Sequence, residues 1–196
     1  MFTALLDSCV LWPSTLRDFL LSLAIEQAYT PAWSSAVLDE VERNEAAKLI
    51  ERGPELSDGE AAQRAAALVR QMRLIFPDAE TQGWEPLEGT FDLPDIDDEH
   101  VVAAAVLAKA GAIVTENAKD FPSNRIPPQI KILSARVFCR DTVEMNPQLA
   151  LRAIREMAAR SGRYGPELDE DSILDILEQR YSLHEATAMI RETMNL

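Results

Sequence analysis

The chain has 196 residues, of which 47% are hydrophobic and 27% charged, and it carries a net charge of −14 at neutral pH. This length accommodates one ordinary domain with a modest extension, and the composition is that of a soluble globular protein. No apolar stretch is long enough to span a bilayer, and the apolar run at residues 2–6 lacks a basic leader. We therefore expect a cytoplasmic protein with neither a membrane segment nor a signal peptide.

The negative charge and the cysteines bear on the class of protein. A nucleic-acid-binding protein normally presents a basic face to phosphates. An acidic chain remains compatible with such a substrate if its carboxylates gather at a divalent-cation site, because the bound cation reverses the local field. The alternative is a solvated acidic surface and a different substrate.

Cys9 and Cys139 lie in apolar segments, which predicts buried thiols rather than a disulfide.

The first elements predicted along the chain are a strand and a helix. Residues 3–6 form a short apolar run, which predicts a buried strand that ends at Asp7. Ser14 is expected to cap the helix that follows. The apolar positions of this helix recur at the helical period, at Leu16, Phe19, Leu20 and Leu23.

Two longer helices are predicted next. Ser34 is expected to cap the first of them, with Glu40 near one edge of its inward-facing side. Ser57 and Glu60 form a capping box that opens the second, which runs towards residue 76.

The remaining part of the predicted sheet lies between residues 83 and 133. Loops are expected at 83–94 and 117–128, a helix at 97–110, and short buried strands at 112–115 and 130–133. Short strands separated by helices indicate an α/β fold, in which a parallel sheet has helices on its faces.

From about residue 141 onwards only helices are predicted. Asn146 and Pro147 are typical of an N-cap followed by proline at the first helical position, and residues 182–185 have the pattern of another capping box. We therefore expect an α/β domain over residues 1–140 and a C-terminal helical extension over residues 141–196.

Three carboxylates follow or precede elements that are expected to meet at one edge of the sheet. Asp7 ends the first strand, Asp98 begins the helix at 97–110, and Asp120 follows the strand at 112–115. Ligands of open parallel sheets bind outside the carboxyl ends of the strands. Carboxylates gathered there repel one another unless a cation compensates them, and Mg²⁺ and Mn²⁺ prefer such oxygen ligands. The pattern therefore predicts a divalent-metal site.

A purely structural interpretation also exists for some of these residues. Asp98 would be favourable at a helix N-terminus simply through the backbone dipole. Asp7 has no such reason to follow a buried apolar run, so a functional interpretation is stronger for it. His100, two residues after Asp98, is expected to have a packing or hydrogen-bonding role rather than to ligate metal.

Four segments taken together resemble the PIN-domain family over roughly residues 2–140. They read LLDSCVLWP from residue 5, WSSAVLDEV from residue 33, LPDIDDEHVVAAA from residue 93 and IVTENAKDFP from residue 113. The resemblance is to the branch that includes VapC-like toxins. It implies a three-layer α/β/α sandwich with a parallel sheet, a bound Mg²⁺ or Mn²⁺, endoribonuclease activity and a cognate antitoxin, and it is compatible with a homodimer.

The resemblance also implies roles for individual residues. The catalytic acids by position would be Asp7, Glu40, Asp98 and Asp120. Three of them, Asp7, Asp98 and Asp120, would be the metal ligands, whereas Glu40 would hold a metal-bound water or help to activate the nucleophile. Substrate-binding or orienting roles would fall to Thr115 and Asn117, and Asp95 would support the site from outside the ligand set.

Two features stand beside this assignment. Cys9 occupies a position at which relatives commonly carry a polar residue, often asparagine, and a thiol is a poor substitute for an amide in orienting a carboxylate.

Arg152 and Arg155 lie on one arc of the helix that follows Pro147. They are predicted to contact the RNA backbone, with a solvated outer face as the alternative.

The sequence thus predicts a Mg²⁺- or Mn²⁺-dependent endoribonuclease that cleaves RNA with a metal-activated water and serves as the toxin of a type II toxin–antitoxin system. A catalytically weak PIN domain that binds RNA or protein is a second reading, and Cys9 favours it. A metal-dependent phosphatase acting on a small phosphate ester is a third.

Overall fold

The computed structural model describes residues 2–52, 56–163 and 166–196. Packing divides the chain into two compact units. Unit 1 consists of Phe2 with the described residues of Pro13–Thr30 and Leu133–Leu196, and unit 2 of those in Thr3–Trp12 and Pro31–Ile132. The expected domain boundary after residue 140 stays a prediction.

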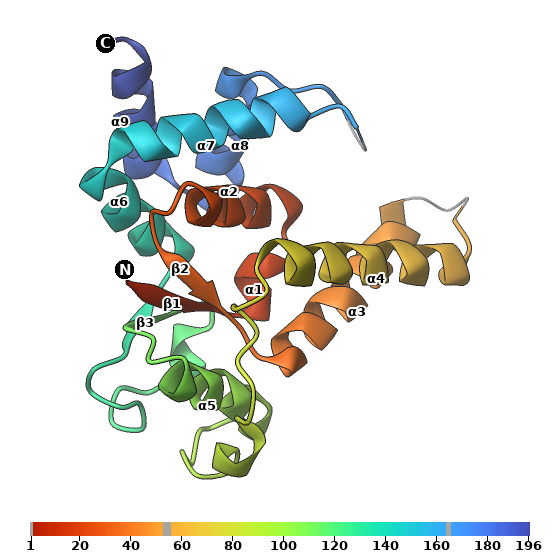
Figure 1. The fold of residues 1–196 in the computed structure, drawn as a ribbon, viewed down its shortest axis with the longest axis vertical. Coiled ribbons are helices and arrows are strands. Elements are labelled where there is room, and N and C mark those ends of the chain that lie inside the picture. Colours follow the sequence, from red (N-terminus) through yellow and green to blue (C-terminus); the bar gives the residue numbers. More distant parts are fainter. Residues whose placement is uncertain (1, 53–55, 164–165) are drawn as a thin grey trace. The chain divides into compact units, whose positions relative to one another are not determined.

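Unit 2 is built around a four-stranded parallel sheet with the strand order β2-β1-β3-β4 (Figure 1). The strands are β1 (Thr3–Leu6), β2 (Thr30–Ala32), β3 (Ala112–Val114) and β4 (Lys131–Leu133). In the central pair Leu5 lies opposite Ile113, and both side chains are fully buried, as expected for parallel strands that are covered on both faces. The predicted α/β fold, a parallel sheet flanked by helices, is confirmed.

The helices of unit 2 are α1 (Ser8–Leu11), α3 (Ser35–Arg52), α4 (Asp58–Ile75) and α5 (Glu99–Leu107). Two of them, α3 and α4, begin where local side-chain chemistry predicts them. Ser34 accepts the backbone N–H of Val37 at 3.0 Å and so caps α3, and Ser57 forms the predicted capping box with Glu60 at the start of α4. Helices α3 and α4 lie side by side, and α5 packs against β1 and β3 (Figure 1).

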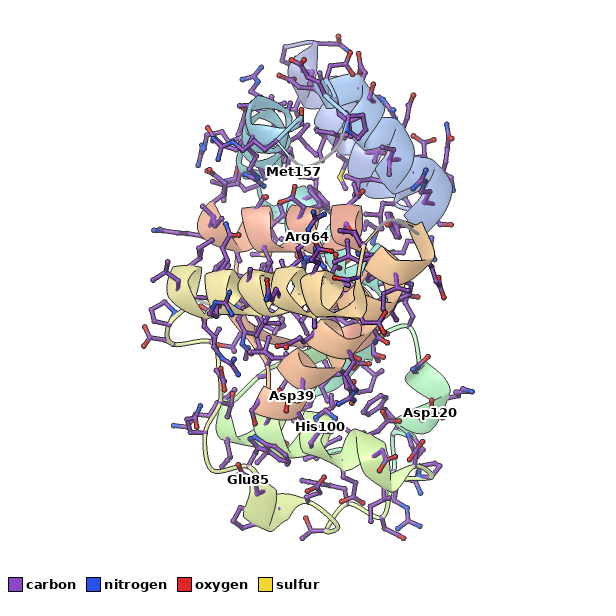
Figure 2. The ribbon with its side chains drawn as sticks, turned by 90° about the vertical axis from the view of Figure 1, so that its right-hand side faces the viewer. Asp39, Arg64, Glu85, His100, Asp120 and Met157 are labelled. Carbon is purple, nitrogen blue, oxygen red and sulfur yellow. The ribbon has the colours of Figure 1, made fainter. Side chains whose placement is uncertain are left out.

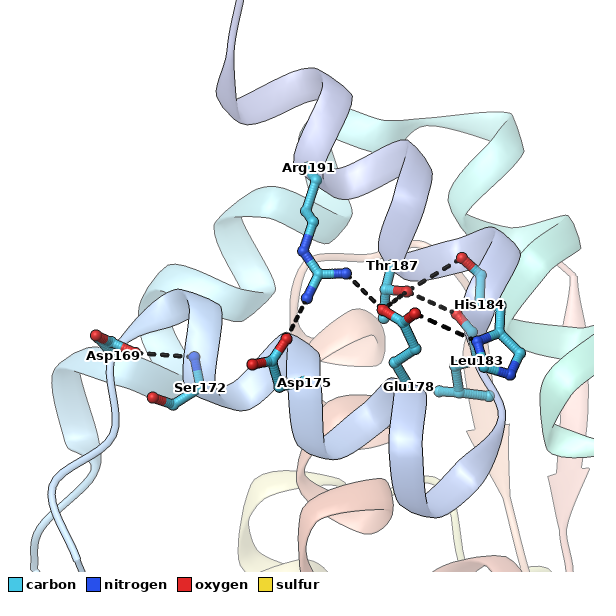
Figure 3. Close-up of polar contacts among 8 residues, drawn as sticks. All are labelled: Asp169, Ser172, Asp175, Glu178, Leu183, His184, Thr187 and Arg191. Atoms are coloured by element: carbon cyan, nitrogen blue, oxygen red, sulfur yellow. Dashed lines mark hydrogen bonds and ion pairs between the residues drawn. The ribbon is translucent and has the colours of Figure 1, made fainter.

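Unit 1 consists of helices. They are α2 (Ser14–Ile25), α6 (Ala135–Met145), α7 (Pro147–Arg160), α8 (Glu170–Tyr181) and α9 (His184–Met194). Helix α7 packs against α2, α8 and α9. Ion pairs join α8 to α9, because Arg191 donates to Glu178 and to Asp175 at 2.6 Å each (Figure 3). Within the described residues, no helix has both the length and the apolar character that crossing a membrane requires.

Several elements differ from the sequence-based expectation. The strand β2 and the four-residue helix α1 were not predicted. Pro13, not Ser14, is the N-cap of α2, and its side chain forms no capping bond. The predicted capping box at residues 182–185 is wrong: Ser182 has φ 56° and ends α8, and α9 begins after Leu183 without a side-chain cap.

A buried carboxylate orders the loop that leads into α5. Glu99 is 2% exposed and accepts hydrogen bonds from the backbone N–H groups of Phe91 and Leu93 at 3.1 Å each. Burial would raise the pKa of Glu99, but these bonds and further backbone donors at Gly89 and Asp92 hold it below its usual value. The ionised carboxylate therefore fixes this loop beside the first turn of α5, where Asp98 lies.

Candidate active site

Asp7 is fixed at the carboxyl end of β1, and only 3% of its surface is exposed. Its backbone N–H donates to the carbonyl of Val114 at 3.1 Å, which continues the pairing of β1 with β3. Its carboxylate oxygen Oδ2 accepts hydrogen bonds from Thr115 Oγ1 at 2.7 Å and from Cys9 Sγ at 3.2 Å. A buried carboxylate held in this way has a defined orientation.

Cys9 takes part in this arrangement as a protonated thiol. Besides donating to Asp7, its Sγ accepts the backbone N–H of Glu116 at 3.2 Å. Burial, together with the negative charge of Asp7, raises the pKa of Cys9 to about 12, so the thiol stays protonated at neutral pH and remains a donor. The thiol is a weak donor, but it touches the carboxylate that an amide at this position was expected to orient.

Thr115 joins the first carboxylate to the turn that carries the last one. Its buried hydroxyl donates to Asp7 and accepts the backbone N–H of Asn117 at 3.0 Å. Asn117 in turn accepts the N–H of Asp120 through its carbonyl at 2.9 Å, within the short helical turn η3 (Ala118–Asp120; Figure 2). Thr115 therefore contacts Asp7 through its hydroxyl and connects to Asp120 through the backbone of Asn117, and its expected role towards substrate stays a prediction.

Glu40 projects from α3 and is held by neighbours on two other elements. It accepts hydrogen bonds from His100 Nε2, at 3.3 Å, and from the side chain of Ser8. Burial would raise the pKa of Glu40, but the hydrogen bonds from His100 and Ser8 bring it below its usual value. Because Ser8 directly follows Asp7 in the chain, Glu40 lies next to the segment that carries Asp7.

Asp98 lies between the turn η2 (Ile96–Asp98) and α5, and its side chain makes no capping hydrogen bond. Asp98 thus occupies the N-cap position of α5, where the backbone dipole favours a carboxylate, but no capping bond holds its side chain. Its pKa is raised to about 6, first by burial and then by the negative charges of Asp7, Asp120, Asp95 and Glu40. The shift means that these carboxylates lie close enough to repel Asp98.

The donor set suits a divalent cation of the Mg²⁺ or Mn²⁺ type, because it consists of carboxylate oxygens that repel one another. Across residues 2–52, 56–163 and 166–196, however, no three His, Cys, Asp or Glu side chains are grouped tightly enough to hold a metal ion as they stand. Mg²⁺ usually keeps several water ligands, so one or two of these carboxylates could hold it, and its charge would offset their repulsion.

Arg152 and Arg155, predicted to contact RNA, lie on α7 in unit 1. Arg152 Nε pairs with Glu26 at 2.6 Å, and Arg155 Nε with Glu170 at 3.6 Å. The side chains of both arginines are 56% exposed. They are thus accessible to solvent while partly neutralised by carboxylates of the same unit. Their contact with RNA stays a prediction.

Ser8 and Ser34 also belong to the site, although the sequence did not indicate it, and His100 has a more specific role than the packing or hydrogen bonding expected for it. Each contact bridges separate elements: Ser8 touches Glu40, and His100 touches both Ser34 and Glu40. Isolated serines and a histidine beside apolar runs carry no signal for such contacts, since the same residues are common as helix caps. The one available signal was the spacing of Ser34 and Glu40, which puts both on the early turns of one helix.

We expect Asp98→Asn to stabilise the metal-free protein, because asparagine keeps the shape of the side chain and removes its charge. Allowing for solvent screening of a half-buried group, the free energy of unfolding should rise by about 1 kcal/mol at pH 7.5. Because the pKa of Asp98 is raised in the folded protein, the wild type loses stability as pH rises from about 4 to about 6. The two proteins should therefore converge at low pH.

The measurement is urea denaturation in the presence of a chelator at both ends of this pH range. The exposed neighbour Asp97 provides the matched control, and Asp97→Asn should leave the stability unchanged within about 0.5 kcal/mol. If Asp98→Asn is no more stable than the wild type at pH 7.5, the neighbouring carboxylates do not repel Asp98.

Comparison with known proteins adds the family to this geometry. A family model described as PIN domain matches residues 3–119, which include Asp7, Glu40 and Asp98. No curated protein and no solved structure matches the chain. PIN domains are typically metal-dependent nucleases. Because residues 3–119 make up more than half of the 196-residue chain, the protein belongs to the PIN-domain family.

Proposed function

We propose that this protein is a Mg²⁺- or Mn²⁺-dependent endoribonuclease and the toxin of a type II toxin–antitoxin pair. Membership of the PIN-domain family supports nuclease chemistry and an RNA substrate in general. The observation that carries the proposal for this chain is the gathering of carboxylates from separate elements around the end of β1. Thr115 fixes Asp7 there by a hydrogen bond, and Glu40 accepts a hydrogen bond from the adjacent Ser8. The negative charges of Asp7 and Glu40 repel Asp98.

The proposed mechanism divides the work among these side chains. Asp7, Asp98 and Asp120 would hold the metal ion, which when bound lowers the pKa of a water nucleophile and stabilises charge on the phosphate. Asp7 is already oriented by Thr115, so it needs little rearrangement. Glu40, kept ionised by its hydrogen bonds, accepts a proton from the attacking water at a carboxylate oxygen.

The remaining parts of the proposal concern substrate and partners. Thr115 and Asn117 would help to position the substrate phosphate beside Asp120, and Arg152 and Arg155 would contact the RNA backbone. The antitoxin would insert a peptide over the carboxylates at the end of β1, in the cytoplasm, and the toxin would act as a homodimer. A neighbouring open reading frame that encodes a small DNA-binding protein would support the toxin role over general RNA processing.

A second candidate is a catalytically weak PIN domain that binds RNA or protein. Two observations favour it: the weak donor Cys9 beside Asp7, and the absence, among the residues the structure describes, of a carboxylate group already tight enough for a metal ion. Saturable RNA binding without metal-dependent cleavage would establish this candidate. Turnover of a generic phosphate ester without RNA cleavage would instead indicate a phosphatase.

We expect Asp7→Asn to reduce Mn²⁺-dependent RNA cleavage by about 100-fold or more, the loss typical of removing a group that stabilises transition-state charge. The measurement is cleavage of a labelled single-stranded RNA with Mn²⁺ or Mg²⁺, with and without chelator. Asp97→Asn controls for the loss of one acidic charge and should retain wild-type activity. Equal cleavage by wild type, Asp7→Asn and the chelated sample would refute the metal-dependent mechanism.

For Arg152→Ala/Arg155→Ala we expect weaker RNA binding with a smaller salt dependence. Two lost phosphate contacts on single-stranded RNA should reduce the slope of log affinity against log salt by about 1.4. Binding is measured in the inactive Asp7→Asn background at several salt concentrations. Arg136→Ala, which also breaks an arginine–glutamate pair of unit 1, is the control. An unchanged affinity and slope would remove both arginines from the proposal.

A further inference from the structure

A chain of polar side chains runs from the first turn of α3 to Glu40 through a buried histidine. Ser34 Oγ lies 2.9 Å from His100 Nδ1, and His100 Nε2 lies 3.3 Å from Glu40 Oε1. His100 is 4% exposed and Ser34 is fully buried. His100 projects from the start of α5 towards α3 (Figure 2), and the ring of Trp84 lies 5.8 Å from the imidazole.

The direction of the hydrogen bond to Glu40 follows from the chemistry of its two partners. An ionised carboxylate only accepts hydrogen bonds, so in this pair the Nε2 nitrogen of His100 is the donor. At the other side of the ring, Ser34 Oγ accepts the backbone N–H of Val37 and keeps its single hydrogen, which His100 Nδ1 is close enough to accept.

Resting on the proposed nuclease function, we propose that His100 is a positioning residue for Glu40: its Nε2–H holds the carboxylate in the orientation in which it accepts a proton from the nucleophilic water. Glutamate has a long side chain, and that of Glu40 is 28% exposed, so without a fixed partner it would sample several rotamers. Ser8 holds the same carboxylate from α1. A base acts efficiently only when it stays within hydrogen-bond reach of the water.

Two variants separate the two nitrogens of the ring. His100→Gln places an amide N–H near the position of Nε2 and retains the donor to Glu40. His100→Asn places an amide oxygen near the position of Nδ1 and retains the acceptor for Ser34, but it loses the donor to Glu40. We expect kcat to fall about 10- to 100-fold in His100→Asn, to stay within about threefold of wild type in His100→Gln, and KM to change little in both.

The Glu40→Gln background tests whether His100 acts through Glu40. A positioning role predicts that His100→Asn causes no further loss of kcat once Glu40 is replaced, because the two substitutions remove one function. Equal losses in His100→Gln and His100→Asn, or an undiminished effect of His100→Asn in the Glu40→Gln background, would mean that His100 serves only to pack the core. Either result overturns the proposal.

A spectroscopic measurement separates this inference from the nuclease proposal. The chain contains two histidines, His100 and His184, so His184→Asn leaves one set of imidazole signals. Two-bond ¹H–¹⁵N correlation spectra of the metal-free protein at pH 7.5 should show a proton bound to Nε2 of His100. An Nε2 nitrogen without a bound proton, as in the Nδ1–H tautomer, would overturn the inference. If the wild type cleaves no RNA, the nuclease proposal fails. The spectrum would still show whether His100 Nε2 donates a hydrogen bond to Glu40.

Discussion

Repulsion among the carboxylates at the end of β1 is the constraint on which the candidate site depends. Asp98 feels the negative charges of Asp7, Asp120 and Glu40, and its raised pKa is the consequence. The groups that hold these acids are largely neutral donors: Thr115 and Cys9 for Asp7, and Ser8 for Glu40. Neutral donors fix the orientation of a carboxylate without cancelling its charge, so the attraction for a dication is retained.

The surrounding structure supplies the rigidity that such a site requires. Residues 4–6 and 112–114 of the central strands are fully buried, and α5 packs against both strands, which fixes the ends that carry Asp7 and Thr115. Glu99 resembles the site acids in chemistry but serves the opposite purpose. Its carboxylate is saturated by backbone N–H groups of the preceding loop and so stabilises the fold. Two adjacent acids at the start of α5 thus have different roles. The carboxylate of Glu99 stabilises the fold, whereas that of Asp98 is repelled by the other carboxylates of the site.

The sequence predicted several elements whose determining chemistry is local, although the caps expected at Ser14 and at residues 182–185 were wrong. The bounds of β1 follow from a continuous apolar run, and Ser34, Ser57 and Asn146 were identified as caps because each bonds a backbone N–H within its own first turn. β2 escaped prediction because three residues that include Pro31 show no alternation. The contacts of His100 join residues more than fifty positions apart, and only the packing of α5 near α3 reveals them.

The proposed function requires that these carboxylates bind a divalent cation. Electron paramagnetic resonance of Mn²⁺, titrated with metal-free protein at pH 7.5, measures this binding without relying on catalysis. We expect saturable loss of the free Mn²⁺ signal with the wild type and with Asp97→Asn, and much weaker loss with Asp7→Asn. Undiminished binding by Asp7→Asn, or no binding by the wild type, would show that the carboxylates at the end of β1 do not hold the cation.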